Sequence, residues 1–320
     1  MNRFLVGMIC LLGLILLPSH VRAQSCSATM GDMVFSGDPT GDQPLESSMN
    51  VKVKCGASLL GSAKKILICT HLNQGTGGGD AYSRIMVNGT DTLDYQIYNE
   101  QNASTVAGSL AYPPAPIARD LSYTSVLLLL GNTEAEFKLY GRVFPNQVAI
   151  PGKYVSGFND AFLRYGGTDC DGESGKRNTI LRFTVSLDVI PSCRVTATSV
   201  NFGEHGALLS DLDAAGKINV TCTRDTQYKV TLGQGLASAG VNGRKMFKDG
   251  MRGNPSVAYN LFRDPARTIV WDNAVPPDTS PWAKIATGIT DVQTVYARVK
   301  AQKTPPTGTY SDSVVVNVYY

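Results

Sequence analysis

Two pairs of cysteines with identical spacing constrain this sequence more than any other feature. The pairs divide the chain into two similar halves, and they are Cys26 with Cys55 and Cys193 with Cys222. Apolar and polar residues alternate on the way to the second cysteine of each half. The apolar positions are Val51 and Val53 in the first half and Ile218 and Val220 in the second. This period of two is typical of half-buried β-strands.

The match between the halves continues beyond the cysteines. Residues 84–86, 95–98, 141–143 and 152–154 correspond to residues 244–246, 259–262, 297–299 and 308–310. Short alternating runs are separated by Gly, Pro, Asn and Asp, and no long helical period occurs. We therefore predict an all-β fold of two immunoglobulin-like β-sandwich domains, residues 24–190 and 191–320.

Residues 1–23 are predicted to be a signal peptide. Arg3 precedes an apolar run from Phe4 to Leu17, and Val21-Arg22-Ala23 fits a signal-peptidase site. We therefore expect export into an oxidising environment. The full chain has 29 basic and 26 acidic residues, and removal of two arginines brings them almost into balance. This balance argues against nucleic acid as a partner.

Removal of the signal peptide also leaves six of the seven cysteines, an even number that predicts disulfides. The second half contains only two cysteines, which are expected to pair. By the repeat, the equivalent cysteines of the first half, Cys26 and Cys55, should also pair. Cys69 and Cys170 then remain and should pair with each other. The predicted disulfides are Cys26–Cys55, Cys69–Cys170 and Cys193–Cys222.

A strand over residues 179–189 marks the boundary between the halves. Its apolar positions alternate cleanly, and they are Leu181, Phe183, Val185, Leu187 and Val189. Pro191 ends the strand just before Cys193 opens the second half. We predict that this strand belongs structurally to the first half and is joined covalently to the second.

The second half lacks an equivalent of strand 179–189, because its last alternating run reaches Tyr320. A β-sandwich without an edge strand exposes unpaired backbone and an apolar groove. The second domain is therefore expected to need a strand from another chain. Candidate acceptor residues for that strand are Val314, Val316, Val318 and Tyr320.

Several motifs resemble the spore coat protein U domain, the subunit domain of archaic (Csu-type) chaperone–usher pili. They are Cys193-x3-Ala197-x4-Phe202-Gly203, Val220-x-Cys222-Thr223, Tyr228-x-Val230-x-Leu232-x3-Gly235, Tyr259-x-Leu261-x2-Asp264 with Trp271, and Gly308-x-Tyr310-x-Asp312. The resemblance is strong over residues 192–320 and looser over residues 24–190. The length of two domains resembles the tip adhesin of such pili.

The resemblance implies an incomplete pilin domain that a periplasmic chaperone holds and an outer-membrane usher assembles by donor-strand exchange. An adjacent pilin would supply the donor strand. Only Gln24 and Ser25 separate the predicted signal peptide from Cys26, and this is too few residues for a donor strand. We therefore expect a position at the pilus tip, outside the cell. Strand 179–189 is then a donor fused to the domain that it completes.

An adhesive tip needs contact residues, which are expected in segments that are longer or more apolar in the first half. The resemblance implies contact with abiotic surfaces through hydrophobic loops, since exposed apolar patches mark interaction sites. Candidates are Leu59, Leu60, Tyr112, Pro113, Pro114, Ile117, Val148 and Ile150. The alternative is that each of these side chains folds back onto its sandwich. The run 126–130 is more typical of a buried strand, although Leu127 and Leu128 remain candidates.

Other classes of function are weighed against adhesion to surfaces. His71 and His205 have no second ligand at metal spacing and are expected to be solvated, and no catalytic motif occurs. We therefore expect no enzyme, cofactor or metal site. A glycan-binding adhesin for a host ligand, using Tyr112 and Tyr82, is one alternative. A secreted coat-type structural protein is another.

Overall fold

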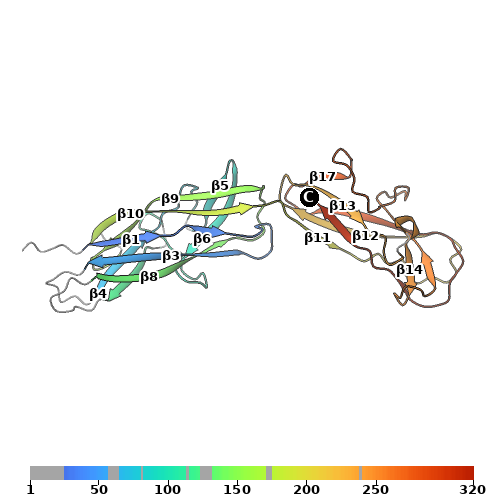
Figure 1. The fold of residues 1–320 in the computed structure, drawn as a ribbon, viewed down its shortest axis with the longest axis horizontal. Helices are drawn as coiled ribbons and strands as arrows, with labels where there is room; N and C mark the ends of the chain where they lie inside the picture. Colours follow the sequence, from blue (N-terminus) through green and yellow to red (C-terminus); the bar gives the residue numbers. More distant parts are fainter. Residues whose placement is uncertain are drawn as a thin grey trace, which may run out of the picture.

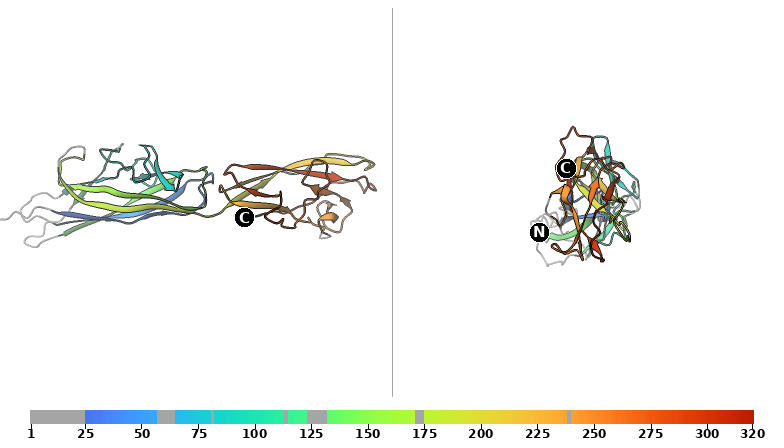
Figure 2. Two further views of the ribbon diagram at one scale, coloured as in Figure 1. Left: turned by 90° about the horizontal axis from the view of Figure 1, so that it is seen from above. Right: turned by 90° about the vertical axis from the view of Figure 1, so that its right-hand side faces the viewer.

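The computed structural model describes residues 25–56, 65–80, 82–112, 115–122, 132–170, 175–237 and 240–320. Regular structure in these residues consists of β-strands and one short 3-10 turn, η1 (Val241–Gly243), so the predicted all-β class is confirmed. The chain forms an elongated molecule with two units joined end to end (Figure 1; Figure 2). We call them the N-terminal unit, with strands β1–β10, and the C-terminal unit, with strands β11–β20.

The N-terminal unit is one sheet folded into two facing layers. Its strands are β1 (Cys26–Met30), β2 (Met33–Phe35), β3 (Leu45–Gly56), β4 (Lys65–His71), β5 (Arg84–Asn88), β6 (Asp91–Tyr98), β7 (Ile117–Ser122), β8 (Asn132–Val143), β9 (Gly152–Tyr165) and β10 (Lys176–Val189). One layer has the order β1-β3-β8-β6, and β5 connects it to the layer that contains β9, β10 and β2. Strands β4 and β7 extend the second layer beside β9.

The core of this unit lies between the two layers. Alternate residues of β3 and β10 enter it, including Val51 and Val185, which are completely buried. The alternation seen in the sequence arises because successive side chains of a strand point to opposite faces.

Strand β10 closes the N-terminal unit. It pairs antiparallel with β9 along its length and parallel with β2, where Val185 lies opposite Met33 and Leu187 opposite Phe35. The side chains of its predicted apolar positions are all buried. The hypothesis that residues 179–189 complete the first half is therefore confirmed.

The C-terminal unit repeats this plan with smaller sheets. Its strands are β11 (Cys193–Ala197), β12 (Leu212–Cys222), β13 (Gln227–Leu232), β14 (Lys245–Lys248), β15 (Ser256–Ala258), β16 (Asn260–Phe262), β17 (Ala283–Ile285), β18 (Asp291–Val299), β19 (Tyr310–Ser311) and β20 (Val316–Tyr319). Sheet β11-β12-β18-β16 lies opposite sheet β17-β13-β20, and β15-β14-β19 form a third sheet. A separate apolar cluster around Trp271 fills this unit.

The three predicted disulfides are present. Cys26–Cys55 and Cys193–Cys222 each join the first strand of a unit to its neighbour, β1 to β3 and β11 to β12. Cys69–Cys170 links β4 to the segment after β9.

A buried arginine occupies the same place in each unit, which the sequence shows only as a repeated residue type. Arg84 and Arg244 are completely buried. Arg84 Nε donates to the carbonyl of Asn73 at 2.9 Å and Nη2 to that of Ala107 at 2.6 Å. Desolvation lowers the pKa of both guanidinium groups. Each guanidinium binds backbone carbonyls of different segments and thereby fixes the strands of its unit relative to each other.

Leu187→Ala should destabilise the N-terminal unit by about 2–5 kcal/mol, because it leaves a cavity in the core between the two layers. Differential scanning calorimetry should show a lower transition for this unit and an unchanged transition for the C-terminal unit. The exposed neighbour Asp188 offers a matched control, since Asp188→Ala should change stability by less than about 0.5 kcal/mol. An equal loss in both transitions would contradict the assignment of β10 to the N-terminal unit.

Candidate interaction sites

The C-terminal unit has an open strand edge where the N-terminal unit is closed. Strand β20 corresponds to β9, and it pairs with β13 on one side. On its other side, where β9 has β10, no strand pairs with β20 in the described part of the chain. We call the space beside this edge the open slot.

The segment on the far side of the open slot, residues 200–202, also pairs with no strand among the residues that the structure describes. Because Cys26 corresponds to Cys193, the residues equivalent to Met33 and Phe35 of β2 are Val200 and Phe202. Met33 and Phe35 are buried and paired with β10. Val200 and Phe202 are only half-buried and lie outside any strand. The same pair of positions is therefore a buried strand where a partner is present and an irregular segment where none is.

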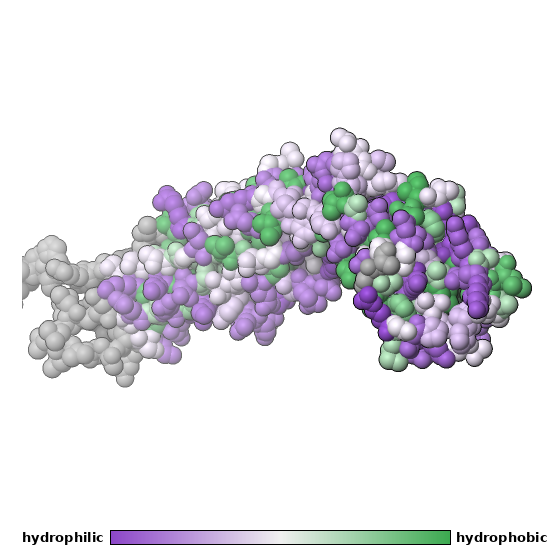
Figure 3. Space-filling model, turned by 45° about the vertical axis from the view of Figure 1, so that its right-hand side comes forward, coloured by the Kyte–Doolittle hydropathy of each residue, from purple (hydrophilic) through white to green (hydrophobic). Residues whose placement is uncertain are grey.

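The predicted acceptor residues border the open slot. Val314, Val316 and Val318 pack against the core of the C-terminal unit but remain partly exposed, and Tyr320 is 62% exposed. Apolar surface also appears as several separate patches on this unit (Figure 3). The residues that would bury a further strand are thus in place beside a free edge.

Asp312 fixes the chain immediately before β20. Its carboxylate accepts hydrogen bonds from Tyr259 Oη at 2.7 Å and from the backbone N–H of Leu236 at 2.8 Å. Burial, together with this bond to the carboxylate, raises the pKa of Tyr259 above its ordinary value. The phenol therefore stays protonated and donates to Asp312, which holds the start of the open edge in position.

The opposite end of the molecule belongs to the N-terminal unit. Two pairs of residues lie there at strand ends, Gly56 opposite Asn132 and Lys65 opposite Ser122. They flank segments 57–64 and 123–131, and Figure 1 shows these strand ends far from the C-terminal unit. We call this region the distal end. The predicted contact residues Leu59, Leu60, Leu127, Leu128, Pro113 and Pro114 lie outside the described residues.

Two other predicted contact residues are in the interior. Tyr112 is 5% exposed, and its ring lies 4.5 Å from the guanidinium carbon of Arg84. Ile117 is 4% exposed and belongs to β7, which packs against the core. Both fold back onto the sandwich because the buried Arg84 and the inner face of the sheet supply partners. Neither side chain is therefore exposed for contact with a surface.

Val148 and Ile150 lie near the junction between the units. Ile150 is half-buried against the N-terminal core. A Cβ atom placed on Gly288 would meet Val148 Cγ1 at 2.5 Å, so this loop contacts the C-terminal unit. Ala149 accepts a hydrogen bond from the backbone N–H of Arg224 at 2.7 Å. This segment therefore connects the two units rather than forming part of the distal end.

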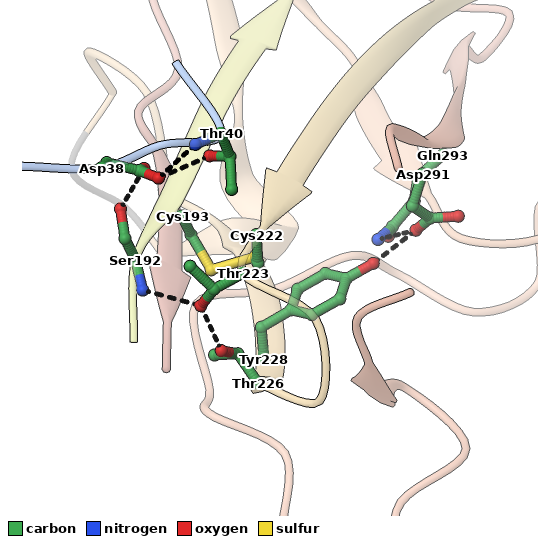
Figure 4. Close-up of a disulfide and its surroundings, with 10 residues drawn as sticks. All are labelled: Asp38, Thr40, Ser192, Cys193, Cys222, Thr223, Thr226, Tyr228, Asp291 and Gln293. Atoms are coloured by element: carbon green, nitrogen blue, oxygen red, sulfur yellow. Dashed lines mark hydrogen bonds between the residues drawn. A yellow bond between two sulfur atoms is a disulfide. The ribbon is translucent and has the colours of Figure 1, made fainter. Parts of the chain in front are cut away.

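Polar contacts hold the junction together. Ser192 Oγ donates to Asp38 at 2.8 Å (Figure 4). Arg194 donates to the carbonyl of Thr40 at 3.1 Å. Arg224 forms an ion pair with Asp91. Only residues 190–192 separate β10 from β11. A short connection and several contacts together favour a fixed orientation of the units.

One expectation about histidine was wrong. His71 is completely buried and its ring stacks on Phe162 with centroids 4.3 Å apart, because β4 and β9 place the two rings side by side. His205 is exposed, as expected. Within the described ranges, no group of three or more His, Cys, Asp and Glu side chains is arranged to hold a metal ion. None of these segments forms a helix of the length and apolarity needed to cross a membrane.

The two units define a class of protein in which a closed β-sandwich is fused to a second sandwich with an open edge. The sequence matches the model of the Spore Coat Protein U domain over residues 15–158 and 179–317, so the chain belongs to that family. It is 30% identical over 131 residues to Protein U of Myxococcus xanthus, covering 38% of this chain and 72% of that protein.

A solved structure shares the fold. It is the pre-assembly complex of the chaperone CsuC and the tip adhesion subunit CsuE from archaic chaperone–usher Csu pili of Acinetobacter baumannii. One chain of that complex superimposes with a TM-score of 0.52 at 18% identity, over 92% of this chain and 100% of that chain.

Arg224→Ala should loosen the junction, because it removes the ion pair with Asp91. The unfolding temperatures should change little, since a partly exposed ion pair contributes about 0–1 kcal/mol. Small-angle X-ray scattering should show a broader range of end-to-end lengths. Lys65→Ala, which removes an ion pair far from the junction, should leave the scattering curve unchanged. Identical scattering curves for Arg224→Ala and the unchanged protein would contradict this role of the ion pair. They would show that the other contacts at the junction are enough to fix the orientation of the units.

Proposed function

We propose that this protein is the adhesive tip subunit of a chaperone–usher pilus and is exported through the periplasm to the cell exterior. The observation that carries the proposal is the difference between equivalent edges. Strand β10 occupies the edge of β9, whereas no strand in the described part of the chain occupies the edge of β20. One unit is therefore complete, and the other is able to accept one strand from a partner.

The incoming strand would pair antiparallel with β20 and parallel with residues 200–202, as β10 pairs with β9 and β2. Its apolar side chains would cover Val314, Val316 and Val318. Strand addition of this kind satisfies unpaired backbone groups and buries alternate side chains. A periplasmic chaperone would occupy the open slot first. The N-terminal extension of the adjacent pilin would replace it at the outer-membrane usher.

Adhesion is assigned to the distal end. Segments 57–64 and 123–131 contain Leu59, Leu60, Leu127 and Leu128, and the strand ends that flank both segments lie at this end. Leucine side chains bind apolar surfaces through the hydrophobic effect, which needs no specific ligand. Attachment to abiotic surfaces at the start of a biofilm fits this chemistry. The alternative hypothesis, a secreted coat-type structural protein, predicts that assembly does not depend on a chaperone.

A synthetic peptide that copies the N-terminal extension of the adjacent pilin should stabilise the C-terminal unit. A ligand that binds only the folded state raises the free energy of unfolding. Calorimetry should show the transition of the C-terminal unit rising by tens of degrees, with no change for the N-terminal unit. Val318→Glu, which places a carboxylate in the open slot, should abolish the rise.

A peptide of the same composition in scrambled order serves as the control for this experiment. If the pilin peptide moves neither transition, the open slot does not accept a donor strand and the assignment to a pilus fails. A rise in both transitions would show binding that is not specific to the open slot.

Replacement of Leu59, Leu60, Leu127 and Leu128 by Ser should reduce attachment of piliated cells to polystyrene about tenfold or more, because each leucine loses roughly 1.5–3 kcal/mol of apolar burial. Detergent should inhibit attachment by the unchanged protein, and salt should not. The measurement is the number of cells retained after washing, at equal pilus number.

Leu209→Ser is the matched control, since Leu209 is 84% exposed but lies in the C-terminal unit. This variant should attach normally. Attachment that survives all four replacements would refute the hydrophobic distal end.

A further inference from the structure

A hollow of about 280 Å³ lies on the outer face of β3, β8 and β6 in the N-terminal unit. Its lining residues are Glu46, Ser47, Ser48, Tyr98, Gln101, Ala103, Lys138, Tyr140, Gly141 and Arg142. We call it the flank hollow, because these residues lie away from the strand ends at the distal end. Neither donor-strand exchange nor the leucine segments account for it.

The internal repeat supplies a direct comparison for the flank hollow. Glu46 lies opposite Arg142 in the N-terminal unit, and Asp213 lies opposite Arg298 in the C-terminal unit. By the same register, Tyr98 and Tyr140 correspond to Phe262 and Tyr296. The loops after β6 and β16 also match, since Ala103 and Arg267 have positive φ values of 57° and 60°. The two faces therefore share their strand register and the backbone conformation at this loop position.

In the C-terminal unit, a side chain of the protein fills the equivalent space. Arg267 Nε lies 3.2 Å from a carboxylate oxygen of Asp213 and donates to the carbonyl of Ala297 at 3.2 Å. Its guanidinium lies 5.7 Å from the centre of the Tyr296 ring. Ala103 is too short to make any of these contacts in the N-terminal unit. The flank hollow is thus the space that Arg267 occupies in the other copy.

The lining of the flank hollow is also more polar than that of the equivalent face. The pairs of residues are Ser48 and Ala215, Tyr98 and Phe262, Gln101 and Pro265, and Lys138 and Thr294, with the N-terminal residue first. At three of these four positions, the residue of the N-terminal unit has a hydrogen-bonding side chain and its counterpart in the C-terminal unit has none. Within the described part of the chain, neither Tyr98 nor Tyr140 uses its hydroxyl in a side-chain hydrogen bond, so both remain available.

The charge at the flank hollow is suited to an anion. Arg142 forms an ion pair with Glu46 at 2.7 Å, while its Nε is buried and has no hydrogen-bond partner in the described part of the chain. Lys138 adds a positive charge. Asp211, which lies 3.6 Å from Arg298 in the other copy, has Pro44 as its counterpart. The flank hollow therefore has one more cation than anion.

We propose that the flank hollow binds an acidic saccharide. The ring of Tyr140 would pack against the apolar face of a sugar, as aromatic side chains do at interfaces. The hydroxyl, amide and carboxylate groups of Tyr98, Gln101 and Glu46 would bind sugar hydroxyls. Arg142 and Lys138 would face the sugar carboxylate, which arginine recognises well. A few placed polar groups around an aromatic surface are typical of small-ligand sites. This site is independent of the open slot and of the leucine segments.

The test uses isothermal titration of the full chain with glucuronic acid, N-acetylneuraminic acid and, as the neutral probe, glucose. At least one acid should bind with a dissociation constant on the order of 1 mM, and glucose should bind at least several-fold more weakly. Ala103→Arg should reduce the affinity about tenfold or more, because arginine fills the same space at the same φ value in the C-terminal unit. Lys138→Ala should lower the affinity for the acid and leave the affinity for glucose unchanged.

Arg267→Ala is the matched control in the C-terminal unit, and it should leave the affinity for the acid unchanged. The thermal transition of the N-terminal unit verifies that each variant is folded. Equal affinity of Ala103→Arg and the unchanged protein would overturn the proposal, as would the absence of binding by both acids at concentrations on the order of 10 mM. None of these outcomes depends on the donor-strand or surface-adhesion proposals.

Discussion

The structure depends on the requirement that a strand edge finds a partner. Strand β10 meets this requirement in the N-terminal unit, because its backbone pairs with β9 and β2 and its alternate side chains fill the core. An unpaired edge leaves backbone donors and acceptors available to another chain. The same chain contains both outcomes, a satisfied edge at β9 and an available edge at β20. The proposed assembly follows from this difference between two copies of one fold.

The repeat also distinguishes the interactions that both units share from those that only one unit makes. Arg84 and Arg244 bind backbone carbonyls in the same way, so this contact belongs to the fold. Ala103 and Arg267 share a backbone conformation but differ in the space they fill, so this difference belongs to the individual units. Two copies in one chain therefore serve as controls for each other. The positions at which they differ are those at which a specific interaction is proposed.

Local patterns in the sequence were sufficient to predict the class of fold, the disulfides and the place of β10. Alternation along a strand depends only on neighbouring residues, and the repeat identified equivalent cysteines. The burial of His71 was not predicted, and the burial of Tyr112 was left open as an alternative to surface contact. Both depend on residues that are distant in the sequence, Phe162 for His71 and Arg84 for Tyr112. A buried arginine is also contrary to the usual preference of charged residues for solvent. The flank hollow was missed because it arises from the short side chain of Ala103, where the other unit has the long side chain of Arg267.

The short connection between β10 and β11 has a mechanical consequence. Strand β10 runs antiparallel to β9 over most of its length and reaches Cys193 after only three residues, 190–192. A pull on the C-terminal unit therefore acts along the axis of β10. Hydrogen bonds between antiparallel strands are perpendicular to the strands. Such a load shears all of these bonds together instead of opening them one after another, and this geometry resists tension far better than a strand that peels from its end.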